Sequence, residues 1–235
     1  AGMTDPHPYP GLLIAIDGID GAGKTTLARA LAEQLRGSGF TVAASKEPTD
    51  GPHGSRLRAS AATGRLPVEQ ELELLEADRA EHAKGLIVPA LQRGDVVILD
   101  RYYFSTAAYQ GAAGLDPPDT LRRSEAIAPR PDVSLILDLP VEVALGRIAA
   151  RGDVANAFER TETLTKCREI FAAVAGMTPG ASVVDAEQDA EWVFQRALAL
   201  VIAGYAEKVN RQEGAVAAVH ALNRHFQLSA EIAPR

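Results

Sequence analysis

The sequence contains very little cysteine and no long apolar run. Cys167 is the single cysteine among 235 residues. One thiol excludes an internal disulfide framework and a cysteine-based zinc site, and it indicates a reducing compartment, so we expect a cytoplasmic protein. No apolar stretch reaches the roughly 18 residues that a membrane span needs, and the first ten residues lack the basic and apolar regions of a signal peptide. We therefore expect no membrane partner.

An excess of positive charge is also missing. The formal net charge is −7, which argues against a dedicated nucleic-acid binder, because such proteins carry a basic surface. The negative net charge does not exclude small anionic ligands, since local geometry rather than net charge holds them. Of the 24 basic residues, 19 are arginine and five are lysine. This bias suits phosphate ligands, because the planar guanidinium can donate to two phosphate oxygens at once.

The pattern of apolar residues is that of an α/β protein. Short apolar runs rich in β-branched residues alternate with helical patterns, as they do in parallel βαβ units. The predicted strands are residues 12–17, 41–45, 96–100, 133–138 and 182–185, and the predicted helices are residues 25–36, 68–91, 141–151, 159–175 and 189–212. We predict a five-stranded parallel sheet flanked by helices in three layers, with ligands at the carboxyl ends of the strands.

A glycine-rich phosphate loop follows the first predicted strand. Residues 18–25, GIDGAGKT, fit the pattern G-x-x-x-x-G-K-[ST] between a strand and a helix. The glycines let backbone N–H groups turn inward around an anion, and the helix adds its positive end. We expect Lys24 at the β- and γ-phosphates of a nucleoside triphosphate and the Thr25 hydroxyl on Mg²⁺. The predicted ATP site in this loop comprises Gly18, Ile19, Asp20, Gly21, Ala22, Gly23, Lys24, Thr25 and Thr26.

Four further blocks indicate what receives the phosphate. They are Glu-Pro at 47–48, Ala-Asp-Arg at 77–79, DRYYFSTAAYQG from residue 100, and an arginine-rich segment from residue 147. In their order and spacing, these blocks and the phosphate loop resemble the thymidylate kinase family over about residues 12–205. The resemblance implies a P-loop NTPase fold with a short lid and a homodimer. It also implies Mg²⁺-dependent transfer of the γ-phosphate of ATP to dTMP, giving dTDP and ADP.

The resemblance assigns roles around the acceptor phosphate and the metal. Arg101 is expected to grip the acceptor phosphate, and Asp100 to help Thr25 place Mg²⁺. Asp20 is expected to hold the acceptor or a metal-bound water. Lys46 stands where many relatives have arginine, so it would neutralise phosphate without a bidentate contact.

The acceptor base and sugar have their own implied contacts. Arg79 corresponds to an arginine that donates to the thymine carbonyl, and Thr106 to a residue at the pyrimidine edge. Tyr109 corresponds to an aromatic residue that lies against the sugar and disfavours a 2′-hydroxyl, and Glu47 to an acid beside the sugar and metal. The implied dTMP site comprises Glu47, Pro48, Leu75, Arg79, Arg101, Ser105, Thr106, Tyr109 and Gln110.

Two departures from the family pattern leave alternatives open. Leu75 stands where relatives place a phenylalanine that stacks on thymine, so a kinase for another pyrimidine nucleotide such as dUMP is one alternative. In the lid, at about residues 147–160, Asn156 and Ala157 replace an expected Asp-Arg pair. A non-catalytic nucleotide-binding protein is therefore a second alternative.

The lid is expected to supply the catalytic arginine. The phosphate loop has Gly21 where one subgroup of the family has an arginine, and relatives with glycine there take the arginine from the lid. We predict that Arg151 reaches the transferring phosphoryl group and that Arg147 stacks on adenine. The predicted catalytic residues are Lys24, Asp20, Arg101 and Arg151.

The domain boundaries complete the predictions. We expect a tag remnant and N-terminal tail over residues 1–10, because Ala1 and Gly2 precede Met3. The kinase-like domain is expected over residues 11–210 and a helical extension over 211–235, where apolar residues recur at helical spacing. The histidines lack metal-ligand spacing, so we expect His82 to be an ordinary surface or core residue.

Overall fold

The computed structural model of the chain describes residues 7–152 and 157–213. The first six residues of the predicted tail, lid residues 153–156 and the predicted extension from residue 214 onward lie outside the described residues. Residues 211–213 of that predicted extension belong to the last helix of the domain, α9 (Ala190–Glu213).

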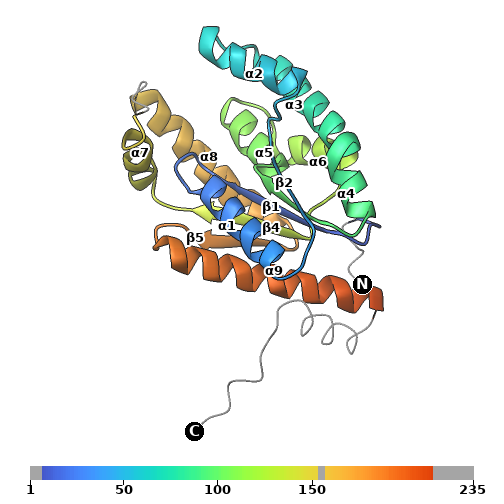
Figure 1. Cartoon of the computed structure of the whole chain (residues 1–235). Coiled ribbons are helices and arrows are strands. Elements are labelled where there is room, and N and C mark those ends of the chain that lie inside the picture. Colours follow the sequence, from blue (N-terminus) through green and yellow to red (C-terminus); the bar gives the residue numbers. More distant parts are fainter. Residues whose placement is uncertain (1–6, 153–156, 214–235) are drawn as a thin grey trace.

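The centre of the structure is the predicted parallel sheet (Figure 1). Its strands are β1 (Leu12–Gly18), β2 (Val42–Lys46), β3 (Val96–Asp100), β4 (Val133–Asp138) and β5 (Ala181–Asp185), in the order β2-β3-β1-β4-β5. All four pairings are parallel. The register places Lys46 of β2 and Ile16 of β1 on either side of Asp100, at the carboxyl end of β3. The predicted five-stranded parallel sheet is thus confirmed.

Helices cover both faces of the sheet, which makes three layers. They are α1 (Lys24–Gly37), α2 (Pro52–Thr63), α3 (Val68–His82), α4 (Val88–Gln92), α5 (Tyr103–Ala112), α6 (Pro117–Ile127), α7 (Val141–Ala149), α8 (Ala157–Met177) and α9. One face carries α1 and α9, and the other carries α5 and α8, with α6 packed outside α5. Figure 1 shows α2 and α3 rising beyond the carboxyl ends of the strands. In the described part of the chain, no helix has both the length and the apolarity needed to cross a bilayer.

Helix α3 departs from the prediction of one uninterrupted helix over residues 68–91. The helical run reaches Gln92, but a π-helical turn, Ala83–Ile87, separates α3 from α4. Pro89 has no N–H to donate in the α-helical register, and the widened turn lies just before it. Helices α2, α5 and α6 were not among the predicted helices.

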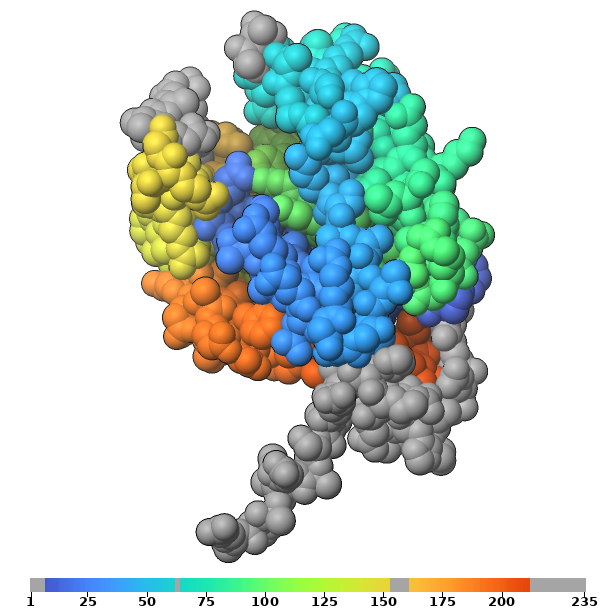
Figure 2. Space-filling view, viewed as in Figure 1, coloured from blue at the N-terminus to red at the C-terminus, as the bar shows by residue number. Residues whose placement is uncertain are grey.

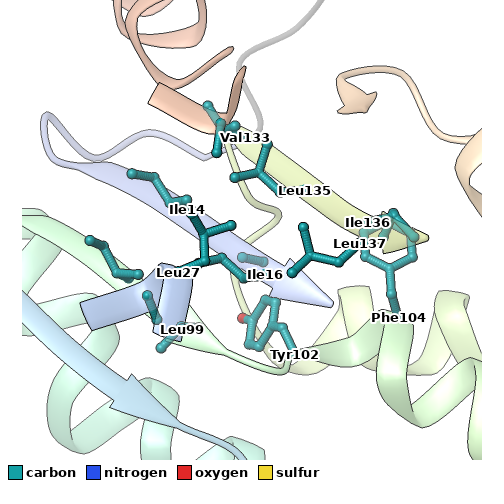
Figure 3. Close-up of a cluster of buried hydrophobic side chains, with 14 of the residues drawn as sticks. Ile14, Ile16, Leu27, Leu99, Tyr102, Phe104, Val133, Leu135, Ile136 and Leu137 are labelled. Atoms are coloured by element: carbon teal, nitrogen blue, oxygen red, sulfur yellow. The ribbon is translucent and has the colours of Figure 1, made fainter. Parts of the chain in front are cut away.

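The core explains why the strands are apolar without alternation. Figure 3 shows Ile14 and Ile16 of β1 between Leu99 of β3 and Leu135 of β4, with Leu27 of α1 packed over them. All five side chains are at most 4% exposed. Because both faces of the central strands are covered, each such side chain contributes about 1.5–3 kcal/mol through burial. The result is a rigid base for the loops at the carboxyl edge.

A buried cluster of charged residues lies at the amino end of β4, opposite the carboxyl ends of the strands. Asp132, just before β4, accepts hydrogen bonds from His7 (2.9 Å), the Leu13 backbone N–H (2.8 Å) and Lys208 of α9 (3.0 Å). His7, Asp132 and Lys208 have side chains at most 2% exposed. The cluster ties a residue of the predicted N-terminal tail and the last helix to the sheet.

Candidate active site

The phosphate loop joins β1 to α1 and packs tightly against α7. Gly21 has a φ of 87°, and a Cβ built there would lie 2.5 Å from the carbonyl oxygen of Ala144. Only glycine fits both this left-handed backbone and this close approach. The loop therefore lies directly on the helix in which the predicted lid begins.

The Lys24 side chain is folded back onto its own loop. Its Nζ donates to the carbonyl oxygens of Gly18 (3.0 Å) and Ile19 (2.8 Å), and the residue is only 6% exposed. Burial lowers the pKa of Lys24 from its usual 10.5 to about 7. The ammonium group is thus poorly solvated before an anion arrives.

Thr25 and Asp100 meet at the predicted metal position. The Thr25 hydroxyl donates to Asp100 Oδ2 at 2.5 Å, although the two residues lie 75 positions apart in the chain. A hydroxyl oxygen and a carboxylate oxygen are ligands that suit a hard cation such as Mg²⁺, which takes its remaining ligands from phosphate and water. These two residues fit the role expected of them.

Arg101 lies between the phosphate loop and the predicted acceptor side. It is the one non-glycine residue with positive φ (70°) in the described part of the chain, and such outliers occur at functional sites. Its guanidinium forms an ion pair with Asp20 and lies 5.3 Å from the centre of the Tyr109 ring. The Tyr109 hydroxyl in turn accepts from the Asp20 backbone N–H at 3.1 Å. Asp20, Arg101 and Tyr109 thus form one unit between the two sides of the site.

A pocket of about 350 Å³ opens beside this unit, between the sheet edge and helices α2, α3 and α5. In Figure 2 it belongs to the hollow between yellow α7 and cyan α2, with green α5 at its floor. The pocket brings together every residue that the family resemblance implies for dTMP: Glu47, Pro48, Leu75, Arg79, Arg101, Ser105, Thr106, Tyr109 and Gln110.

Arg79 forms the polar wall of this pocket and is only 1% exposed. Its Nε and Nη2 donate to Glu47 Oε2 at 2.9 and 2.7 Å, and Nη2 also donates to Thr106 Oγ1 at 2.9 Å. Nη1 donates to Ser124 Oγ at 3.0 Å. The guanidinium is thereby fixed in one orientation. The carboxylate of Glu47 is thus hydrogen-bonded to protein side chains. The family resemblance implies instead that it lies beside the sugar and metal.

Gln110 contributes an acceptor to the same pocket. It is 4% exposed, and its Oε1 has no hydrogen-bond partner among the described residues. A buried amide oxygen without a partner is costly, so such a group is a candidate for contact with a ligand donor.

The two predicted lid arginines lie at different places. Arg151 lines a cavity of about 170 Å³ together with Lys24, Thr25, Lys46 and Asp100. Arg147 instead lines a groove of about 950 Å³ along α1, and its Nη1 donates to the Ala186 carbonyl oxygen at 2.9 Å. Arg151 is therefore on the phosphate side, and Arg147 is on the far side of the phosphate loop.

Two acidic residues that position the site were missed by the sequence analysis. Asp17 Oδ1 accepts from the backbone N–H groups of Tyr102 and Ser105, both at 3.0 Å, and so caps the start of α5. Burial raises the pKa of Asp17. Asp78 accepts from the backbone N–H groups of Thr49 (2.7 Å) and Gly54 (3.1 Å), which fixes the loop after β2. The position of Asp17 at a strand end was the available signal.

Arg58 is a further cation that the sequence analysis missed. It lies on α2, lines the acceptor pocket, and donates from Nη1 to the Pro48 carbonyl oxygen at 3.1 Å. It also pairs with Asp50 at 3.0 Å, and Asp50 pairs with Lys46 at 3.3 Å. No motif marks this arginine, because α2 has only a weak amphipathic pattern.

Comparison with known proteins agrees with this geometry. The family model described as "Thymidylate kinase" matches residues 16–197. A thymidylate kinase of Xanthomonas euvesicatoria pv. vesicatoria (strain 85-10) is 58% identical over 208 residues, which cover 88% of this chain and 91% of that protein. A thymidylate kinase of Xylella fastidiosa (strain M12) is 56% identical over 192 residues, or 82% of this chain and 87% of that protein. The family match over residues 16–197 and these relatives show that the chain belongs to the thymidylate kinase family.

Proposed function

We propose that this protein transfers the γ-phosphate of ATP to dTMP in a Mg²⁺-dependent reaction that yields dTDP and ADP. The main supporting observation is that the cavity at the phosphate loop, of about 170 Å³, and the pocket of about 350 Å³ share Asp20, Glu47 and Arg101 in their walls. A donor on one side and an acceptor on the other would therefore meet at one point of the sheet edge. The names of the relatives support the same activity.

The chemistry rests on positioning and charge. The attacking oxygen of a nucleoside monophosphate is already anionic, so the site needs no general base. Lys24, Arg101 and Arg151 line one cavity. In this proposal Lys24 and Arg151 neutralise the transferring phosphoryl group, and Arg101 holds the acceptor phosphate. Thr25 and Asp100 would hold Mg²⁺, which when bound neutralises charge on the β- and γ-phosphates. Arg147 remains the predicted contact of the adenine ring.

The polar groups of the acceptor pocket fit the edge of thymine. Four of the five N–H donors of Arg79 are assigned to Glu47, Thr106 and Ser124, which leaves one on Nη1 for the O4 carbonyl. Gln110 Oε1 can accept from the N3–H group. Cytosine presents the opposite pattern at these two positions, a donor and an acceptor, so the pocket discriminates against it. Leu75 offers apolar contact to the base.

A nucleotide panel tests the proposal. We would measure ADP formation from Mg·ATP with dTMP, dUMP, dCMP and UMP as acceptors. We expect dTMP to be the best substrate and dCMP to be poor. Equal rates with dTMP and dUMP would favour the first alternative, and ATP binding without any acceptor-stimulated ADP release would favour the second. The presence of Lys24, Thr25 and Arg101 in place disfavours a non-catalytic protein.

We also propose a homodimer that acts in the cytoplasm. The family resemblance supports the dimer, and light scattering coupled to size-exclusion chromatography tests it. A monomer at micromolar concentration would contradict it. The buried thiol of Cys167 is compatible with a reducing compartment.

A further inference from the structure

His82 occupies an unexpected place at the end of α3, beneath the acceptor pocket. Its Nδ1 lies 3.0 Å from Glu47 Oε1, and its Nε2 lies 2.8 Å from the Ser45 hydroxyl. The carboxylate of Glu47 can only accept, so we assign a hydrogen to Nδ1, and in the neutral ring Nε2 then accepts from the Ser45 hydroxyl. The side chain is 4% exposed, and both ring nitrogens are engaged with residues of the second strand and the loop after it.

The contact with His82 continues into the pocket through Glu47. One carboxylate oxygen of Glu47 faces His82, and the other accepts two hydrogen bonds from Arg79. Glu47 has no free rotation while both partners hold it, because its side chain is 4% exposed between them. A row of hydrogen bonds thus runs from Ser45 through His82 and Glu47 to Arg79. His82 itself does not line the pocket.

We propose that His82 is a positioning residue for acceptor recognition, which holds Glu47 so that Arg79 points its free N–H at the pyrimidine carbonyl. This inference rests on the proposed function. Buried charge pairs are specific only when every oxygen and N–H is satisfied, and loss of one member leaves the others to rotate. Without His82, the Oε1 atom of Glu47 would hydrogen-bond to another donor. The Glu47 carboxylate would then reorient, and the Arg79 guanidinium would move with it.

The expected consequence is confined to the acceptor. Loss of the Nδ1–H donor should raise the KM for dTMP about tenfold, the change expected for one hydrogen bond to a charged group. The preference for dTMP over dCMP should fall by a similar factor, because a fixed donor at the base edge is what rejects cytosine. The KM for ATP should stay within about twofold, since the phosphate loop lies on the other side of Arg101.

Three substitutions at this position separate the contacts. His82→Asn places an amide N–H near the position of Nδ1 and so keeps a donor to Glu47. The longer side chain of His82→Gln reaches toward Ser45 and has no donor to Glu47. His82→Leu removes both contacts at similar volume. We expect the Asn variant to have nearly the same KM for dTMP as the unchanged protein. The Gln and Leu variants should show a raised KM for dTMP and a reduced preference for dTMP over dCMP. Steady-state kinetics with each nucleotide, and calorimetric binding of dTMP without ATP, give the readouts.

A matched control lies on the neighbouring helix. His53 of α2 pairs with Glu81 of α3 at 3.3 Å, but it is partly exposed and lies outside the pocket. His53→Leu should leave both KM values and the nucleotide preference unchanged.

Several results would overturn the proposal. These are an unchanged KM for dTMP in His82→Leu, equal increases in the KM for dTMP and for ATP, or identical behaviour of the Asn and Gln variants. If the Leu variant does not fold, the comparison of Asn with Gln decides. Turnover of dTMP by the unchanged protein tests the proposed function separately, so a failure of the inference can be told apart from a failure of the proposed function.

Discussion

The hydroxyl of Thr25 and the carboxylate of Asp100 are joined by a hydrogen bond of 2.5 Å. Thr25 lies in the first turn of α1 and Asp100 ends β3, and β1, which leads into α1, pairs with β3. The sheet thus brings together, at the predicted metal position, two residues that are far apart in the sequence. Substitution can remove the Thr25 hydroxyl or one carboxylate oxygen of Asp100 with little change in the shape of the side chain.

Removal of the Thr25 hydroxyl should impair the use of Mg²⁺. In Thr25→Val, we expect the Mg²⁺ concentration for half-maximal rate to rise about 10- to 100-fold, as it does when metal-site partners are lost. Asp100→Asn should act in the same direction. Titration of the initial rate with Mg²⁺ measures the effect. Thr165→Val, an exposed change on α8, is the control and should leave the Mg²⁺ requirement unchanged.

Nucleotide binding should take up a proton at Lys24. The pKa of this residue is about 7 in the free protein because it is buried, and the phosphates of ATP favour its charged form, so binding raises the pKa. Above about pH 7, affinity should therefore fall as pH rises, by up to about tenfold per pH unit. Calorimetry at about pH 8 in buffers of different ionisation enthalpy should reveal the uptake. Lys24→Arg should abolish it, and buffer-independent heats in the unchanged protein would contradict the mechanism.

The strands and the phosphate loop were predictable because they carry local signals. A run such as residues 133–138 is apolar throughout because both faces of its strand are covered, and each predicted strand lies within one residue of the observed one. Helix α6 had a start signal that was passed over, since Asp116 precedes Pro117 and caps the Asp119 N–H at 3.0 Å. Helix α5 has no apolar stripe, because seven of its ten residues are buried, and period-based analysis therefore fails there.

The acceptor pocket was predictable only through family resemblance. Its lining residues come mainly from the phosphate loop, the loops after β2 and β3, and helices α2, α3 and α5. No local pattern brings Glu47 to Arg79. The part that even resemblance missed is the support behind the pocket. His82 was expected to be an ordinary residue, because a lone histidine on a helix carries no pattern that distinguishes a buried hydrogen-bonding role from a solvated one.

A side chain at Gly21 should displace the lid arginines. The Cβ of Gly21→Ala would meet the Ala144 carbonyl oxygen at 2.5 Å, so α7 must shift, and with it Arg147 and Arg151. A displacement of about 1 Å in a catalytic site can lower the rate about 100-fold, and we expect kcat/KM for ATP to fall to that extent. Gly39→Ala is the control, because Gly39 has a φ of 93° but nothing within 4 Å. It should lower stability by about 1 kcal/mol and leave kinetics unchanged.

Loss of the Asp132 charge should destabilise the fold without affecting the chemistry. Asp132→Asn leaves Lys208 buried beside a neutral amide, and breaking a buried pair in this way lowers the free energy of unfolding by about 3–5 kcal/mol. Asp119→Asn removes an exposed partner of Arg122 and should lower it by less than about 1 kcal/mol. Denaturant unfolding at neutral pH compares the two variants, and equal losses would contradict the prediction.

The same carboxylate should make stability depend on pH in the acid range. Burial alone would raise the pKa of Asp132, but the hydrogen bond from His7 and the charges of His7 and Lys208 outweigh it, and the pKa lies below its usual 3.8. A carboxyl group with a lowered pKa in the folded state contributes stability that is fully present above the unfolded value and lost as pH falls through the folded value. Unfolding measured from about pH 6 down to about pH 3 should therefore show a steeper loss in the unchanged protein than in Asp132→Asn. Parallel pH profiles would show that Asp132 titrates alike in the folded and unfolded chains, and that its three donors do not favour the charged form.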